Sequence, residues 1–209
     1  MKLHGYFRSS AAWRVRIALG LKGLKAEDVF HHLRKGEQTE PAYLALNPQG
    51  LLPAFETDDG QVLTQSLAII EYLDEVYPEP SLLPGDALNR AKIRAAALVV
   101  AADIHPIQNL KILNRVRALG QDDEGVQLWA RTTIDEGLAA LNSLLEAQSG
   151  PFALGDQPTL ADICLIPQLG NARRFGVDLR WPRLLQIETA CLALPAFQDA
   201  APDQQADAE

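Results

Sequence analysis

The sequence predicts a small α/β domain followed by an all-helical domain, and three observations support this. The first eighty residues alternate between short apolar runs, typical of strands, and amphipathic helical runs. A proline-rich segment follows, with Pro78, Pro80 and Pro84. Beyond it, every patterned segment has helical periodicity. The chain has 209 residues, of which 47% are hydrophobic, and this is enough for two small cores.

The predicted order of the first domain is β-α-β-α-β-β-α. Its strands are expected at 2–6, 26–31, 54–57 and 61–64, and its helices at 12–21, 41–46 and 66–77. Asp58-Asp59-Gly60 separates the last two strands and is a hairpin signal. Ser66 is expected to cap the last helix, which Pro78 stops. This order favours one α/β layer with parallel strands first and a hairpin last.

The second domain is expected to contain only helices, at 89–119, 123–148, 159–174, 182–192 and 195–200. Pro106 interrupts the first of these and is predicted to kink it. Thr159 and Asp162 have the spacing of a capping box at the start of the third.

The predicted boundaries follow from these patterns. We expect a first domain at 1–78, a linker at 79–87, a helical domain at 88–200 and a flexible acidic tail at 201–209. The tail is expected to be flexible because it has too little apolar surface to order itself.

Composition excludes several classes of protein. The net charge of −8 argues against a nucleic-acid binder, and no apolar run reaches the length of about 18 residues that a membrane span needs. The first residues resemble a strand rather than a leader, so a cytoplasmic location is expected. Cys164 and Cys191 lie in apolar helical segments and are expected to be buried free thiols. No metal site is expected, because the adjacent side chains of His31 and His32 point apart.

Several motifs resemble those of the soluble glutathione transferases. FRSSAAWRVRIAL (7–19) is similar to the zeta-class signature, which runs Ser-Ser-Cys-x-Trp-Arg-Val-Arg-Ile-Ala-Leu. Similar family segments are matched by NPQGLLPAF (47–55), QSLAIIEYL (65–73), GDQPTLADICLIPQ (155–168) and NARRFGVDL (171–179). The resemblance covers nearly the whole chain. It implies a thioredoxin-like glutathione-binding domain, an all-helical glutathione-transferase domain, glutathione as cofactor and a two-fold homodimer.

The same resemblance implies an activity. Zeta-class enzymes are glutathione-dependent cis–trans isomerases that convert maleylacetoacetate to fumarylacetoacetate in tyrosine and phenylalanine breakdown. Three alternatives stay open: a maleylpyruvate isomerase, a transferase acting on small α-halo acids, and a glutathione-binding or ligand-carrying protein without catalysis. The last is kept open by Ala11, which stands where the class usually has a cysteine.

The expected thiol site lies where the first strand meets the first helix. Ser9 and Ser10 place hydroxyls and free backbone N–H groups together there, and such groups stabilise a thiolate whose ordinary pKa is about 8.5. The residues alone are equally consistent with two helix caps. By resemblance, Ser9 donates the hydrogen bond to the thiolate, assisted by Ser10 and Ala11. Arg14 and Arg16 are expected to form ion pairs.

The rest of the glutathione site is implied by resemblance. Gln65 and Ser66 would hold the γ-glutamyl carboxylate at a helix N-terminus. Leu52 would pair its backbone with the cysteinyl part, before a cis Pro53, although a trans proline is the default from sequence alone. Gln38 would contact the glycyl end.

The remaining candidates concern the substrate and the helical domain. Arg8 and Arg174 would bind the substrate carboxylate in a crevice between the domains, and Arg8 would also stabilise developing negative charge. Ordinary surface charge is the alternative for both. His105 and Asn109, on either side of the Pro106 interruption, correspond to family positions that contact glutathione, and Gln108 lies beside them.

Overall fold

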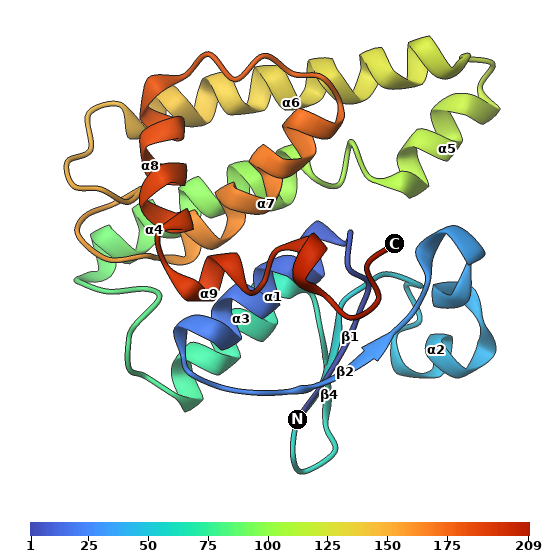
Figure 1. The fold of residues 1–209 in the computed structure, drawn as a ribbon, viewed down its shortest axis with the longest axis horizontal. Coiled ribbons are helices and arrows are strands. Elements are labelled where there is room, and N and C mark those ends of the chain that lie inside the picture. The colour runs from blue at the N-terminus through green and yellow to red at the C-terminus, as the bar shows by residue number, and fades with distance from the viewer. The chain divides into compact units, whose positions relative to one another are not determined.

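The structure is a computed structural model that describes residues 1–209, and its contacts divide the chain into two compact units. The first unit comprises Met1–Leu82 together with Leu192–Glu209, and the second comprises Leu83–Cys191. The first unit contains a four-stranded sheet with helices, and the second contains no strand (Figure 1). The predicted combination of an α/β domain and a helical domain is confirmed.

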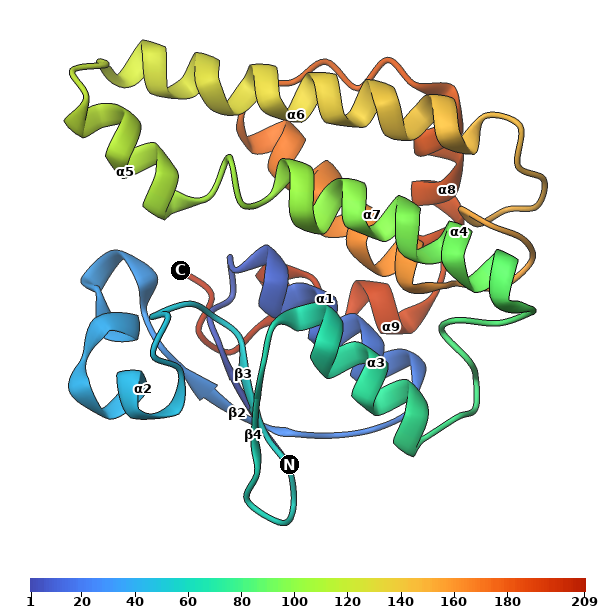
Figure 2. The ribbon, with the colours of Figure 1, turned by 180° about the vertical axis from the view of Figure 1, so that it is seen from behind.

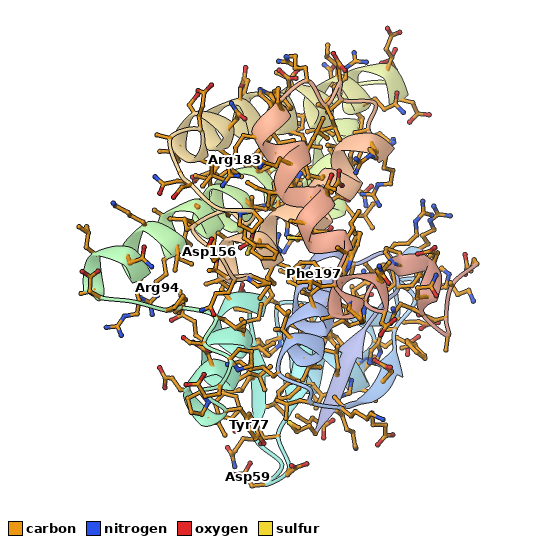
Figure 3. All side chains as sticks on the ribbon, turned by 60° about the vertical axis from the view of Figure 1, so that its left-hand side comes forward. Asp59, Tyr77, Arg94, Asp156, Arg183 and Phe197 are labelled. Carbon is orange, nitrogen blue, oxygen red and sulfur yellow. The ribbon has the colours of Figure 1, made fainter.

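The sheet of the first unit is mixed, as the sequence predicts. Its strands are β1 (Lys2–Gly5), β2 (Glu27–Phe30), β3 (Ala54–Glu56) and β4 (Val62–Thr64), in the order β2-β1-β3-β4. β1 and β2 are parallel, whereas β3 is antiparallel to both β1 and β4. The β3–β4 connection is the predicted hairpin, with Asp59 at its tip (Figure 3). Leu3 and Phe55 face each other in register and are both buried.

Four helices accompany this sheet: α1 (Ser10–Leu21), α2 (Pro41–Leu46), α3 (Ser66–Val76) and α9 (Pro195–Gln198). α1 and α3 lie side by side on one face of the sheet (Figure 2). Ile17, Ile69 and Leu73 are fully buried, which accounts for the apolar stripes of the two helices.

The second unit is built from α4 (Ala87–Leu98), α5 (Leu110–Ala118), α6 (Asp123–Leu145), α7 (Leu160–Arg174) and α8 (Pro182–Leu192). α7 packs against α4 and α6, and nearly every residue of α7 is buried. Its apolar residues belong to the core, and the polar side chains of Asp162, Gln168 and Asn171 are buried with them. Cys164 and Cys191 are free and buried, as expected. No helix of the structure combines the length and apolarity that a membrane crossing requires.

The predicted kinked helix at 89–119 is wrong in detail. α4 continues into a π-helical turn, η3 (Val99–Ile104), and a non-helical turn then separates η3 from α5. Pro106 lies in that turn. Because proline has no N–H and clashes with the preceding turn, the chain breaks there into two helices instead of bending.

The predicted boundaries and the flexible tail also differ from the structure. Residues 192–209 belong to the first unit, because α9 packs on α1 with Phe197 and Ala200 buried. The approach is close: a Cβ on Gly20 would lie 3.1 Å from Ala196. The tail continues through a short helix, η4 (Pro202–Gln204), to polar contacts with the β1–α1 loop. Hydrogen bonds therefore order a segment whose apolar content alone predicts flexibility.

A pair of histidines, the buried His4 and the half-buried His31, predicts acid sensitivity in the first unit. His4 Nε2 lies 2.6 Å from Glu56 Oε1, and His4 Nδ1 lies 2.9 Å from His31 Nε2, within hydrogen-bond distance. Burial, and then the neighbouring His4, lower the pKa of His31, against the attraction of Glu37 and Glu40. An imidazole with a lowered folded pKa binds its proton more readily when unfolded. The free energy of unfolding should therefore fall as pH drops below about 6.5, the unfolded pKa of histidine.

Urea unfolding of wild type and His31→Gln, measured at pH values on both sides of this point, tests that expectation. The variant should lose less stability on acidification than the wild type does. Identical pH dependence in the two proteins would contradict it.

Candidate functional site

The hydroxyl of Ser9 lies at the beginning of α1. Ser9 is the N-cap, and its Oγ accepts a hydrogen bond from the N–H of Ala12 at 3.2 Å. Its own N–H donates to the Tyr6 carbonyl at 2.9 Å, which closes a turn after β1. Ser10 and Ala11 form the first turn of the helix, and both are buried. The predicted thiol-binding residues therefore share one helix N-terminus, where backbone N–H groups favour an anion.

A second helix N-terminus in this unit belongs to α3. Its N-cap is Gln65 rather than the predicted Ser66, because Gln65 adopts a φ of 68°. This conformation is costly for a residue with a side chain and is usually held by its surroundings. The Gln65 side chain does not cap the helix, so the first turn of α3 is open to an external acceptor. The buried hydroxyl of Ser66 accepts a hydrogen bond from Arg14 Nη1 at 3.3 Å.

The Leu52–Pro53 peptide bond is cis, as the resemblance implies. It lies directly before β3, so Leu52 stands at the beginning of an inner strand of the sheet. The preceding carbonyl, that of Leu51, accepts hydrogen bonds from Tyr43 Oη at 2.7 Å and Asn47 Nδ2 at 2.6 Å. Burial raises the pKa of Tyr43 to about 12, so this hydroxyl remains a donor at neutral pH. Side chains of α2 and of its C-cap therefore fix the conformation of the segment at Leu52.

The loop before Pro53 also connects the other predicted glutathione-binding residues. Gln49 accepts a hydrogen bond from Gln65 Nε2 at 2.9 Å. A Cβ on Gly50, whose φ is 61°, would lie 3.3 Å from the carbonyl of Gln38. Gln38 itself belongs to a short helix, η2 (Glu37–Thr39), and its side-chain Oε1 is buried with no hydrogen-bond partner. Gln38 and Gln65 thus both lie beside the loop that contains Gln49 and Gly50 and leads to Leu52.

The predicted residues of the second unit gather at the break before α5. Asn109 is the N-cap of α5, and its Oδ1 accepts a hydrogen bond from the N–H of Lys111 at 3.3 Å. His105 is the C-cap of the η3 turn and directly follows it. Gln108, between them, is buried, and its Oε1 has no hydrogen-bond partner. Asn109 therefore has a structural role in addition to the predicted one.

The arginines differ in how strongly the fold holds them. Arg173 binds Glu188 through both terminal nitrogens, at 2.5 and 2.6 Å. Arg174 is exposed at the C-terminal end of α7, with its guanidinium 4.9 Å from the Phe175 ring centroid. Arg8 lies similarly over the ring of Phe7, at 5.7 Å. Arg173 is thus held in a bidentate ion pair, whereas Arg8 and Arg174 each lie over the ring of a neighbouring phenylalanine.

Sequence reasoning missed several residues that hold the site together. Arg14 binds Ser66, and Arg16 donates to the carbonyls of Phe7 and Ala200, contacts that the sequence does not predict. Gln49 is missed altogether. No local pattern marks these contacts, because each joins segments far apart in the chain.

Comparison with known families agrees with this architecture. The family model "Glutathione S-transferase, N-terminal domain" matches residues 3–81, and "Glutathione S-transferase, C-terminal domain" matches residues 85–187. The chain therefore belongs to the glutathione S-transferase family.

Individual relatives identify the class to which the chain belongs within the family. A maleylacetoacetate isomerase of Pseudomonas aeruginosa is 49% identical over 99% of this chain and 98% of its own. The holo structure of a bacterial maleylpyruvate isomerase, described as a zeta-class glutathione transferase, is 46% identical, with a TM-score of 0.97 and full coverage of both chains. A maleylacetoacetate isomerase from Anaeromyxobacter dehalogenans, solved with dicarboxyethyl glutathione and citrate, is 45% identical over 100% of this chain and 97% of that one, with a TM-score of 0.90. Within the family, the chain groups with the zeta class, as its signature predicts.

Proposed function

We propose that this protein is a glutathione-dependent cis–trans isomerase that converts maleylacetoacetate to fumarylacetoacetate, the step expected in tyrosine and phenylalanine breakdown. The observation that carries the proposal is the Ser9 hydroxyl at the N-terminus of α1, beside Arg8, in a zeta-class chain. This arrangement provides a donor for a thiolate and a cation for the substrate in consecutive residues.

The residues present suit glutathione. The uncapped first turn of α3 fits the γ-glutamyl carboxylate, and the backbone of Leu52 before β3 fits the cysteinyl peptide. The buried, unpartnered Oε1 of Gln38 suits an N–H of the glycyl end. When bound, glutathione supplies a thiol that adds reversibly to the maleyl double bond, allows rotation about it and is then eliminated.

The residues of the chain have distinct roles in this reaction. Ser9 donates its hydroxyl hydrogen to the thiolate, while the N–H groups of Ser10 and Ala11 add positive potential. These contacts lower the thiol pKa, and each unit of lowering corresponds to about 1.4 kcal/mol. Arg8 and Arg174 bind the substrate carboxylate and stabilise the negative charge that develops beside the keto group. His105 and Asn109 are proposed to contact glutathione.

The decisive experiment is to follow isomerisation of maleylacetoacetate and maleylpyruvate side by side, with and without glutathione. Turnover that requires glutathione and is faster for maleylacetoacetate is expected. No turnover of either compound, with glutathione still bound, would reject the isomerase and leave a halo-acid transferase or a carrier.

Maleylpyruvate isomerase is the second candidate, favoured by the TM-score of 0.97 to a protein of that name. Its chemistry is identical and its substrate is shorter. A preference for maleylpyruvate in the same assay would assign this activity. We also propose a cytoplasmic location and a two-fold homodimer. Light scattering of the purified chain tests whether it is a dimer.

The proposal makes a prediction for Arg174. Arg174→Ala should raise the KM for the maleyl substrate about tenfold, because a charged hydrogen bond to a carboxylate is lost, and should leave the KM for glutathione nearly unchanged. Steady-state kinetics with each substrate varied in turn provide the measurement. Arg131→Ala, which removes an exposed arginine of α6, is the matched control and should behave as wild type. Equal effects of the two changes would mean that Arg174 contributes only surface charge.

A further inference from the structure

The acidic tail, residues 199–209, contacts the loop that precedes the proposed catalytic residues. After α9 and η4, it runs back to the end of β1, and the C-terminus lies on that side of the sheet in both ribbon views (Figures 1 and 2). Asp207 Oδ2 accepts a hydrogen bond from the backbone N–H of Phe7 at 2.9 Å. Phe7 directly precedes Arg8 and Ser9.

Phe7 is held on both sides of its backbone. Its N–H is bound by Asp207, and its carbonyl accepts a hydrogen bond from Arg16 Nη2 at 3.1 Å. Arg16 Nε also donates to the carbonyl of Ala200, at 3.0 Å. The β1–α1 loop, α1 and the tail are thus joined through one arginine and one aspartate.

Charge strengthens this connection. Burial lowers the pKa of Arg16 to about 10, and the carboxylates of Asp28 and Asp207 oppose this, so the arginine and Asp207 attract each other in a partly desolvated place. Further along the tail, Glu209 Oε1 bonds His32 Nε2 at 2.6 Å. That bond, with smaller contributions from Lys35 and Arg34, holds the pKa of Glu209 below its usual value. The acidic tail therefore lies against the basic segment that contains His32, Arg34 and Lys35.

The β1–α1 loop is short, so the position of Phe7 affects that of Ser9. Only Arg8 lies between Phe7 and Ser9, and the Ser9 N–H is bonded back to Tyr6. A shift of Phe7 therefore moves the Ser9 hydroxyl, and a displacement of about 1 Å at a reacting group lowers rates severely. We propose that Asp207 is a positioning residue: by holding the Phe7 N–H, it sets the place of the Ser9 hydroxyl at the glutathione thiol. The proposal rests on the role proposed above for Ser9.

The test measures the thiolate directly, so that it does not depend on which acid the enzyme isomerises. The ultraviolet absorbance of bound glutathione thiolate is titrated with pH in the full chain, in Asp207→Ala and in Asp203→Ala. Asp203, an exposed acid of the same tail that accepts a hydrogen bond from the neighbouring Gln204, is the matched control. We expect the bound thiol of Asp207→Ala to titrate about one unit higher, a tenfold loss of thiolate at low pH, and the control to match wild type.

Two further measurements separate positioning from general stability. The thermal midpoint of Asp207→Ala should stay near that of the wild type, and kcat should fall about tenfold while the KM for glutathione changes less than about twofold. If Asp207→Ala does not fold, Asp207→Asn, which keeps a side-chain oxygen acceptor without the charge, should show a smaller shift in the same direction.

Several results would overturn the proposal. Unchanged thiolate titration in folded Asp207→Ala would do so, as would a faster enzyme, which would make the tail a restraint on the site. A shift in Asp207→Ala with none in Ser9→Gly would show that Asp207 does not act through Ser9. Failure of the isomerase proposal is recognised separately, by the absence of turnover in the wild type.

Discussion

Replacing Asp162 with alanine should destabilise the helical unit by about 3 to 5 kcal/mol, because two buried N–H groups and one hydroxyl lose their acceptor. Asp162 is fully buried at the start of α7. Its Oδ1 accepts from the Ala153 N–H at 2.7 Å, and its Oδ2 accepts from the N–H and the hydroxyl of Thr159 at 2.8 and 2.9 Å. Burial raises the pKa of Asp162, whereas these donors favour its ionised form. No water reaches the site to replace the carboxylate.

Thermal and urea unfolding of Asp162→Ala, Asp162→Asn and Asp156→Ala provide the measurement. Asp156 is an exposed aspartate of the same loop, labelled in Figure 3, and its loss should cost less than about 0.5 kcal/mol. The asparagine variant keeps one acceptor and should fall between the two. A wild-type midpoint for Asp162→Ala would mean that α7 does not depend on its capping box.

The elements predicted best from the sequence are those encoded locally. The stripe of α3, the hairpin at Asp58-Asp59-Gly60 and the capping box at Thr159 each involve neighbours within four residues, so the pattern and the structure coincide. The pairing directions of β1–β2 and β3–β4 follow from the same elements, because a short hairpin forces antiparallel pairing and a helical crossover permits parallel pairing.

The failures come from interactions that no local pattern contains. Gln65, not Ser66, is the N-cap of α3, and its backbone adopts a positive φ, which side-chain preference does not predict. Hydrogen bonding changes to a π-turn at Val99–Ile104, before Pro106 is reached, and no local pattern predicts this change. The tail is ordered by a hydrogen bond between Phe7 and Asp207, residues 200 positions apart.

The candidate site also contains two kinds of residue, those that local motifs identify and those that only the fold brings to it. Ser9 and Gln65 are recognisable because short motifs surround them, and the resemblance assigns their chemistry. Gln49 bonds Gln65 directly, whereas Arg14 and Asp207 bond the neighbouring residues Ser66 and Phe7, and only the fold brings these segments together. Motifs therefore identify the residues that touch a ligand better than they identify the residues that position them.

Replacing Ser9 with glycine should lower kcat about 100-fold, the effect typical of removing a hydrogen-bond donor at a developing or resident anion. Binding of glutathione should weaken less than about threefold, because the peptide contacts proposed at Leu52 and Gln65 remain. Glycine is chosen because it keeps most of the N-cap preference, whereas alanine loses about 1 kcal/mol of helix stability. Ser9→Gly therefore removes the hydroxyl while leaving α1 nearly as stable as before.

Comparison of the two variants separates chemistry from capping. If the hydroxyl acts on the thiolate, Ser9→Gly and Ser9→Ala lose turnover equally, although only the alanine variant has a clearly lower melting temperature. If Ser9 only caps α1 through its bond to Ala12, the glycine variant turns over almost as wild type and the alanine variant loses activity in proportion to its stability. Steady-state kinetics, calorimetric titration with glutathione and thermal unfolding of the three proteins distinguish these cases. Parallel loss of turnover and of glutathione affinity would instead make Ser9 a binding residue, and the donor to the thiolate would then have to be sought in the hydroxyl of Ser10 or the N–H groups of the first turn.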